Sequence, residues 1–189
     1  MLNGVFSDFE IDKMNVKFAD QTESAAIAMN CVGSVEEEMT AKVITKKCRG
    51  VEIKHIVKGT GEGTLKISAH VPYTIFKEEF AMALDSLKDG VQAYGGNSKH
   101  KEFCLTLHVK DEDGEEKYKA YPRCVCNARP TISTENGAEE VAEVEMEVAV
   151  MPDSYGNGMY EALASEIDKT LQGKWMSDFT PALVQAQTV

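Results

Sequence analysis

The amino-acid sequence predicts a mainly β fold of the α+β class, in which strands outnumber helices. Three observations carry this prediction. Several segments alternate apolar and polar residues, which is typical of half-buried strands. An Asp-Gly pair at 113–114 lies between two such segments and is a strong hairpin signal. Apolar residues recur at helical spacing in few places, and 189 residues are enough for one well-buried core.

The most informative strand lies in an acidic stretch, residues 130–168, which holds ten Asp or Glu residues and no Lys or Arg. It supplies nearly all of the formal net charge of −11. Residues 141–150 alternate strictly, and successive strand side chains point to opposite faces. Valine and methionine therefore line one face, and Glu143, Glu145 and Glu147 line the other. Such an anionic face repels nucleic acid. The alternative interpretation is the solvated outer face of a sandwich strand.

The remaining strands are predicted from shorter alternating or β-branched runs. The sequence Lys-Gly-Thr-Gly-Glu-Gly at 58–63 predicts a hairpin, because its glycines tolerate positive φ. A phosphate-binding loop is excluded there, since such loops precede a helix and a strand follows here. The expected strands are 25–32, 38–45, 51–57, 64–71, 103–110 and 117–126.

Two helices and an N-terminal extension complete the expected organisation. One amphipathic helix is predicted over 74–87 and a second over 159–171. A tail with Trp175, Phe179 and Leu183 follows, and it is expected to pack locally or on a neighbour. Residues 1–24 are expected to form an arm or a first irregular strand, and residues 25–189 a single domain.

The chain also contains a basic segment. Residues 42–58 include six basic residues and one acidic residue, Glu52. Opposite charges concentrated in separate segments predict a pairing within or between subunits. The simpler alternative is that both segments keep a small domain soluble. The six basic residues are Lys42, Lys46, Lys47, Arg49, Lys54 and Lys58.

The sequence holds no recognisable catalytic or metal-binding motif. Its five cysteines include no Cys-x-x-Cys pair, and its four histidines are scattered, which argues against a zinc site. Serine-nucleophile, zinc-protease and nucleotide-loop motifs are missing. The prediction is therefore a non-enzymatic protein without a metal or cofactor, and the acidic net charge argues against nucleic-acid binding.

The sequence also gives expectations about location. No apolar run reaches the ~20 residues that cross a bilayer. The N-terminus lacks the basic and apolar regions of a secretory signal. Together with the odd number of cysteines, these features predict a protein that is made in a reducing cytoplasm and does not enter a membrane.

A pattern of segments spread over roughly residues 35–185, none of them a catalytic motif, carries a family likeness. The segments are 47–55, 59–73, 99–106, the Asp-Glu-Asp-Gly at 111–114, 117–122, 135–153 and 174–185. Together they resemble major tail proteins, the tail tube proteins, of phages and prophages of Gram-positive bacteria.

The resemblance implies an antiparallel β-sandwich or barrel of the tail-tube type, with one flanking amphipathic helix and a short C-terminal helix. It implies hexameric rings that stack into a virion tail tube, assembled in the host bacterial cytoplasm. Tape-measure and tail-terminator proteins are the implied partners, and DNA passes transiently through the lumen. Glu143, Glu145 and Glu147 are then candidates for the lumen wall. The basic segment becomes a candidate loop between subunits or rings.

Two other functions fit the same sequence. A tail adaptor, a terminator, a baseplate module or an unrelated β-sandwich would use the same core without polymerising, and would stay monomeric at high concentration. A small cytosolic enzyme would retain a metal or a nucleotide through purification.

Overall fold

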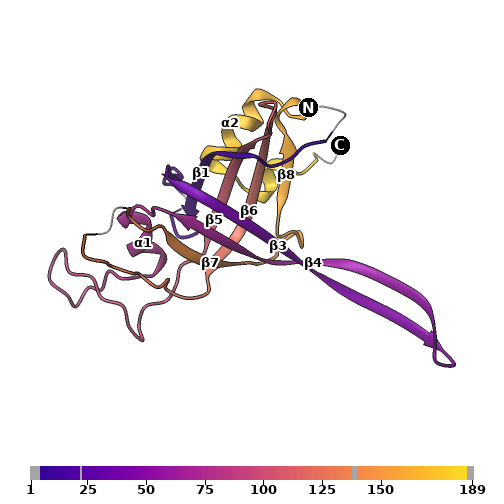
Figure 1. The fold of residues 1–189 in the computed structure, drawn as a ribbon, viewed down its shortest axis with the longest axis horizontal. Helices are drawn as coiled ribbons and strands as arrows, with labels where there is room; N and C mark the ends of the chain where they lie inside the picture. The colour runs from indigo at the N-terminus through magenta and orange to yellow at the C-terminus, as the bar shows by residue number, and fades with distance from the viewer. Residues whose placement is uncertain (1–4, 22, 138–139, 187–189) are drawn as a thin grey trace.

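The computed structural model describes residues 5–21, 23–137 and 140–186 and contains one antiparallel eight-stranded sheet (Figure 1). The sheet order is β2-β1-β5-β6-β7-β4-β3, and β8 also pairs with β6. The predicted mainly β, antiparallel fold with few helices is confirmed. The elements are β1 Glu10–Phe18, β2 Ile27–Met29, β3 Val32–Cys48, β4 Val51–Ala69, α1 Tyr73–Glu79, β5 Phe103–Lys110, β6 Glu116–Cys126, β7 Val144–Val150, β8 Tyr160–Leu163, the 3-10 helix η1 Ala164–Glu166, α2 Lys169–Asp178 and the 3-10 helix η2 Pro181–Val184.

The main core lies on the concave face of this sheet, which curls until β3 approaches β1. Alternate residues of β7 point into it, and Met146, Val148 and Val150 are buried while Glu145 and Glu147 are exposed. The alternation predicted over 141–150 is therefore confirmed for residues 144–150, whereas residues 141–143 precede the strand. Helix α1 adds Ile75 to the same core. Burial of such side chains stabilises the fold by roughly 1.5–3 kcal/mol each.

The opposite face of β1, β5 and β6 is covered by α2 (Figure 1). Asp168 begins this helix and accepts hydrogen bonds from the backbone N–H groups of Thr170 and Leu171 at 2.8 and 2.9 Å. Trp175 and Phe179 pack against Tyr118 in a second core. Trp175 and Phe179 are buried, and Leu183 is partly buried against the same second core, so the predicted tail residues pack locally. Among the described residues, no helix covers the outer face of β7, β4 and β3.

Strands β3 and β4 continue far beyond the sheet as a two-stranded arm, residues 41–59 (Figure 1). The chain reverses at Arg49 and Gly50, whose φ angles of 50° and 81° suit a tight two-residue turn. The predicted hairpin at 58–63 is wrong, because β4 runs unbroken through these glycines. Residues 60–62 instead lie opposite Thr40 alone, which forms a bulge at the root of the arm.

Two glycines hold the root of the arm against the loop that follows β7. Gly61 has a φ of 78°, and a Cβ on Gly158 would lie 2.0 Å from the carbonyl oxygen of Gly61. Glycine is therefore required at Gly158 by close backbone approach and at Gly61 by conformation as well. The loop fixes the point at which the arm leaves the body.

Both predicted helices differ from those observed. α1 stops at Glu79 rather than 87, and Ala81 has a φ of 46° that a helix cannot contain. The helix predicted over 159–171 is wrong, because residues 160–163 form β8 and pair with β6. Pairing with an existing strand satisfies their backbone groups, and the helix begins only after Asp168.

Part of the segment predicted as an arm is a strand of the body. β1 pairs with β2 and β5, and Met14, Val16 and Phe18 are buried in the main core. Of the two interpretations of residues 1–24, the strand therefore describes residues 10–18. Residues 1–4 and 22 of that segment lie outside the described residues.

Replacing Gly158 by alanine is expected to lower the free energy of unfolding by about 1–3 kcal/mol, because the new methyl group meets backbone that cannot yield. Gly173 in α2 has open space around it, so Gly173→Ala is the matched control and should stabilise by about 0.5–1 kcal/mol. Urea denaturation measures both. Equal effects of the two substitutions would contradict the close approach.

Candidate functional site

The arm gathers the whole predicted basic segment and separates it from an acidic body. Residues 41–59 are all exposed. The strands predicted over 38–45 and 51–57 belong to β3 and β4, and the extended loop expected in this segment is reduced to the turn at 49–50. Six basic residues and Glu52 give this arm +5, which leaves −16 for the rest of the chain. Because the arm projects into solvent, its charge is not neutralised by its own body (Figure 1).

Like charges face each other across the arm. The strand register places Lys42 opposite Lys58 and Lys46 opposite Lys54, with the pair Ile44–Ile56 between them. Like charges directly opposite in an antiparallel pair destabilise it by up to about 1 kcal/mol. These six residues share one face of the arm, which we name the lysine–isoleucine face.

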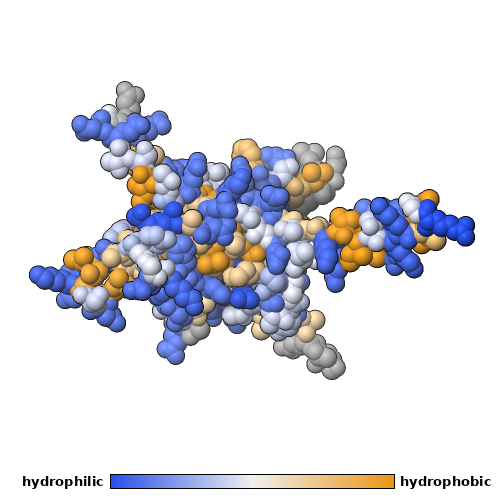
Figure 2. All heavy atoms as spheres, turned by 90° about the horizontal axis from the view of Figure 1, so that it is seen from below, coloured by the Kyte–Doolittle hydropathy of each residue, from blue (hydrophilic) through white to orange (hydrophobic). Residues whose placement is uncertain are grey.

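The arm also exposes apolar side chains on both of its faces. Ile44 is 49% exposed on the lysine–isoleucine face, and Val43 and Val57 are 54% and 59% exposed on the opposite face. Figure 2 shows this apolar surface on the projecting arm. Exposed apolar side chains gathered on a projecting element make the arm a candidate interaction surface.

The predicted acidic residues lie on the uncovered outer face of the sheet or beside it. Glu145 lies opposite Ser68 and Glu147 opposite Lys66 in the register of β7 with β4. The Asn127 side-chain amide donates to Glu147 at 2.7 Å. Glu143 precedes the strand rather than belonging to it.

Glu143 nevertheless joins the same acidic surface. Its carboxylate accepts a hydrogen bond from the Ser68 hydroxyl at 2.6 Å. It also lies over Gly33, where a Cβ would come within 2.3 Å of it. The three predicted glutamates are therefore brought together, and all three are exposed. Their surroundings include one cation, Lys66.

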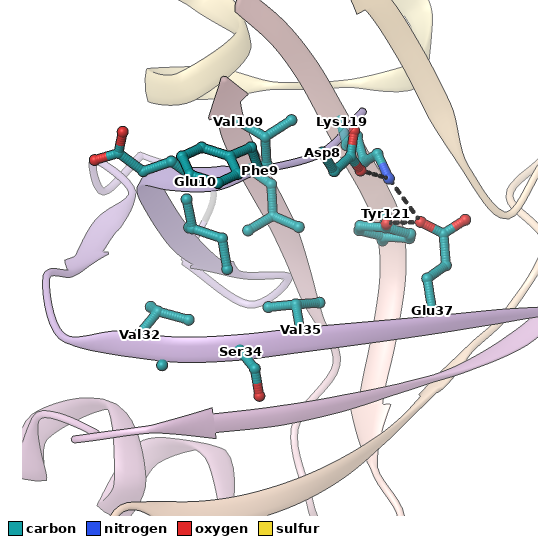
Figure 3. Close-up of a pocket in the computed structure, with 13 residues that line it drawn as sticks. Asp8, Phe9, Glu10, Val32, Ser34, Val35, Glu37, Val109, Lys119 and Tyr121 are labelled. Carbon is teal, nitrogen blue, oxygen red and sulfur yellow. Dashed lines mark hydrogen bonds and ion pairs between the residues drawn. The ribbon is translucent and has the colours of Figure 1, made fainter. Parts of the chain in front are cut away.

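A groove of about 450 Å³ opens between the base of β3 and the segment that leads into β1 (Figure 3). Its apolar lining comes from Val32 and Val35 on one side and from Val109 on the other. At one end Tyr121 and Lys119 both donate to the Glu37 carboxylate. The rim carries Phe9, Asp8 and Glu10. Sequence reasoning missed this groove, because it joins segments far apart in the chain.

Among the described residues, one buried carboxyl, that of Glu79, has a strongly shifted pKa, and it lies against the main core. Glu79 is 2% exposed, and the Cys126 thiol donates to its Oε1 at 2.6 Å. Burial raises the pKa of Glu79 to about 7, and burial likewise raises the pKa of the Cys126 thiol. A protonated thiol in an enclosed core is not a nucleophile, so this pair is structural.

Neither a metal cluster nor a membrane helix is found in the described part of the chain. Within residues 5–21, 23–137 and 140–186, no three His, Cys, Asp or Glu side chains gather as metal ligands do. Over the same residues, no helix is both long and apolar enough to cross a bilayer.

No protein-family model and no curated protein matches this chain. It is similar to a chain in the cryo-EM structure of the anti-feeding prophage baseplate, with 12% identity, a TM-score of 0.47, and 86% of this chain and 97% of that chain covered. It is also similar to a chain of the anti-feeding prophage tube-terminating cap, with 9% identity, a TM-score of 0.44, and 87% of this chain and 100% of that chain covered. A chain of the extracellular contractile injection system PVC sheath-tube complex in the extended state has 8% identity and a TM-score of 0.46, with 86% of this chain and 95% of that chain covered. Likeness at this level assigns no role to this chain.

Glu79→Gln is expected to flatten the pH dependence of stability between about 4.5 and about 7. The folded pKa lies above the ordinary value of 4.5, so the unfolded chain loses this proton first and stability falls as pH rises through that window. The wild-type fall is at most about 1.4 kcal/mol per pH unit. Urea unfolding at pH 4.5, 5.5 and 7 measures it. Parallel curves for both proteins would contradict ionisation of Glu79 in the core.

Proposed function

We propose that this chain is a non-enzymatic structural subunit of a phage-tail-type tube, which assembles through its basic arm. The single observation that carries this proposal is the charge division between an arm of +5 and a body of −16. Opposite charges that cannot meet within one copy attract between copies. Exposed valine and isoleucine on the arm give the contact an apolar component.

The sequence resemblance supplies the form of this assembly. It implies hexameric rings that stack into a virion tail tube, with tape-measure and terminator proteins as partners. In this proposal the basic arm residues Lys42, Lys46, Lys47, Arg49, Lys54 and Lys58 contact neighbouring subunits. The acidic surface of Glu143, Glu145 and Glu147 lines the lumen. DNA then passes a wall that repels it, so it slides rather than binds.

Reversing one lysine pair tests the role of the arm. Lys46→Glu with Lys54→Glu keeps like charges opposite each other, so the arm itself is disturbed little. The charge of the arm falls from +5 to +1, which weakens its attraction to the acidic body. Sedimentation velocity over a concentration series is expected to show that assembly needs at least about tenfold more protein, which is about 1.4 kcal/mol.

Lys88→Glu with Lys174→Glu is the matched control, because both lysines are exposed on the body and the net charge changes equally. The control should assemble as the wild type does. Equal weakening by both pairs would mean that net charge rather than the arm governs assembly. A wild type that stays monomeric at every concentration would overturn the proposal in favour of a non-polymerising adaptor.

Reversing the acidic surface tests the lumen assignment. Glu145→Lys with Glu147→Lys is expected to leave assembly intact, because both side chains are exposed, and to make assembled particles retain DNA at low salt. Fluorescence anisotropy of a short labelled DNA strand measures retention. Glu145→Gln with Glu147→Gln is the neutral control. Loss of folding or assembly in the reversed variant would contradict a lumen position.

A further inference from the structure

We infer that the lysine–isoleucine face of the arm docks into the groove beside Val35 of a second copy of this chain. This inference rests on the proposed function and names the two surfaces that meet. Three observations support it: the arm has opposed lysines and exposed isoleucines, the groove has apolar and acidic lining residues, and the two are too far apart to meet within one copy.

The arm needs a receptor that is apolar at its centre and anionic around it. The pair Ile44–Ile56 occupies the middle of the face, and one lysine pair lies on each side of it. Each lysine pair costs stability until an acidic partner compensates it. The opposite face differs, because the pair Thr45–His55 lies there beside the pair Val43–Val57. The Glu52 carboxylate already lies 2.8 Å from the His55 ring nitrogen.

The groove provides this combination. Its floor is formed by Val35, Leu107 and Val109, and its volume of about 450 Å³ lies within the ~300–1,000 Å³ of small-ligand sites. Three carboxylates, of Asp8, Glu10 and Glu37, and one cation, Lys119, line it, so the lining carries a formal charge of −2. Lys119 binds both Asp8 and Glu37, and Lys117 also binds Asp8, which leaves Glu10 as the carboxylate most open to a lysine of the arm.

Two features leave the groove open to a partner. Within residues 5–21, 23–137 and 140–186 no salt bridge to Glu10 is found; Lys110, which binds Asp12, interacts with Glu10 only electrostatically. Phe9 at the rim is 74% exposed. Figure 3 shows Phe9 and Val109 facing Val32 and Val35 across the groove. In the described sheet β3 is the last strand, so its second edge is also unpaired.

The other anionic surface lacks an apolar centre. The depression beside Glu145 and Glu147 is lined by Ser34, Glu36, Lys66 and Ser68, with Ile67 and Met146 belonging to the core face of their strands. Isoleucine side chains placed there would stay against polar groups. The groove therefore fits the arm better than the surface proposed for the lumen, and the two surfaces keep separate roles.

The arm cannot reach the groove of its own copy. Residues 37 and 44 belong to one strand, β3, so about 23 Å separate them at 3.3 Å per residue. Docking is therefore intermolecular. Arm and groove are different surfaces, so the contact is heterologous, and such contacts generate closed rings or open filaments.

Variants on the two faces of the arm test the first half of this inference. Ile44→Ser with Ile56→Ser should raise the concentration needed for assembly, whereas Val43→Ser with Val57→Ser, which removes similar apolar area from the other face, should raise it less. All four residues are exposed, so the folded body is unaffected. An equal or reversed effect in sedimentation velocity would overturn the assignment of the face.

Crosslinking between two chains tests the groove itself, in a background of Cys31→Ser and Cys48→Ser. A chain with Ile44→Cys is mixed with a longer, tagged chain that carries Val35→Cys, and a short bismaleimide is added. The mixed dimer should form in greater yield than with Val43→Cys, the control on the opposite face. The other cysteines are fully or partly buried.

The outcomes separate this inference from the proposed function. Assembly with no excess crosslinking to Val35 would overturn the groove and leave the tube subunit standing. A wild type that never assembles would overturn both. Crosslinking to Val35 together with the stronger effect of the isoleucine variants is the result that we expect.

Discussion

The ladder between β3 and β4 is the interaction on which the rest of the structure depends. At one end it is anchored by Leu65 and Ile67, both buried in the main core, and at the other it continues unsupported into solvent. A two-stranded ribbon alone is marginally stable in water. The arm therefore owes its order to the sheet at its root, where the bulge opposite Thr40 and the contact of Gly61 with Gly158 fix its exit.

Charge follows the same division as packing. The arm is basic and exposed, and the body is acidic, so electrostatic compensation has to come from outside the copy. Each feature alone has an ordinary explanation as a solvated surface, and exposed pairs contribute little. What distinguishes the arm is the combination of opposed lysines, exposed isoleucine and projection beyond the body. In the assembly that we propose, an acidic and apolar partner surface compensates all three features.

Sequence patterns predicted the elements whose side chains decide their structure. The strands at 103–110 and 117–126 agree with β5 and β6, because an Asp-Gly turn and a buried face act together there. The hairpin predicted at the glycine-rich segment is wrong because glycine is common in β-bulges as well as in turns. The sequence does not distinguish the two, whereas the pairing of this segment with β3 shows a bulge. Residues 160–163 became a strand because β6 offered an edge, which no local signal records.

The acidic and basic surfaces could be predicted from the sequence, whereas the groove could not. The acidic face followed from strand alternation, and the six basic residues from charge alone. Their pairing has a signal in the sequence, because Lys42 and Lys58, like Lys46 and Lys54, lie symmetrically about Gly50. That symmetry has meaning only once the turn is known to lie at Arg49–Gly50. The groove has no comparable signal, since it joins the start of β1 to β3, β5 and β6.

In the assembly that we propose, the folded copy is incomplete until its arm meets another copy. Negative-stain electron microscopy of the purified protein over a concentration series, with light scattering on the same samples, is the decisive experiment. Rings or hollow striated tubes are expected, and they should dissociate as salt rises, because ~1 M salt shortens the screening length to about 3 Å. Single compact particles at every concentration and at low salt would contradict this proposal.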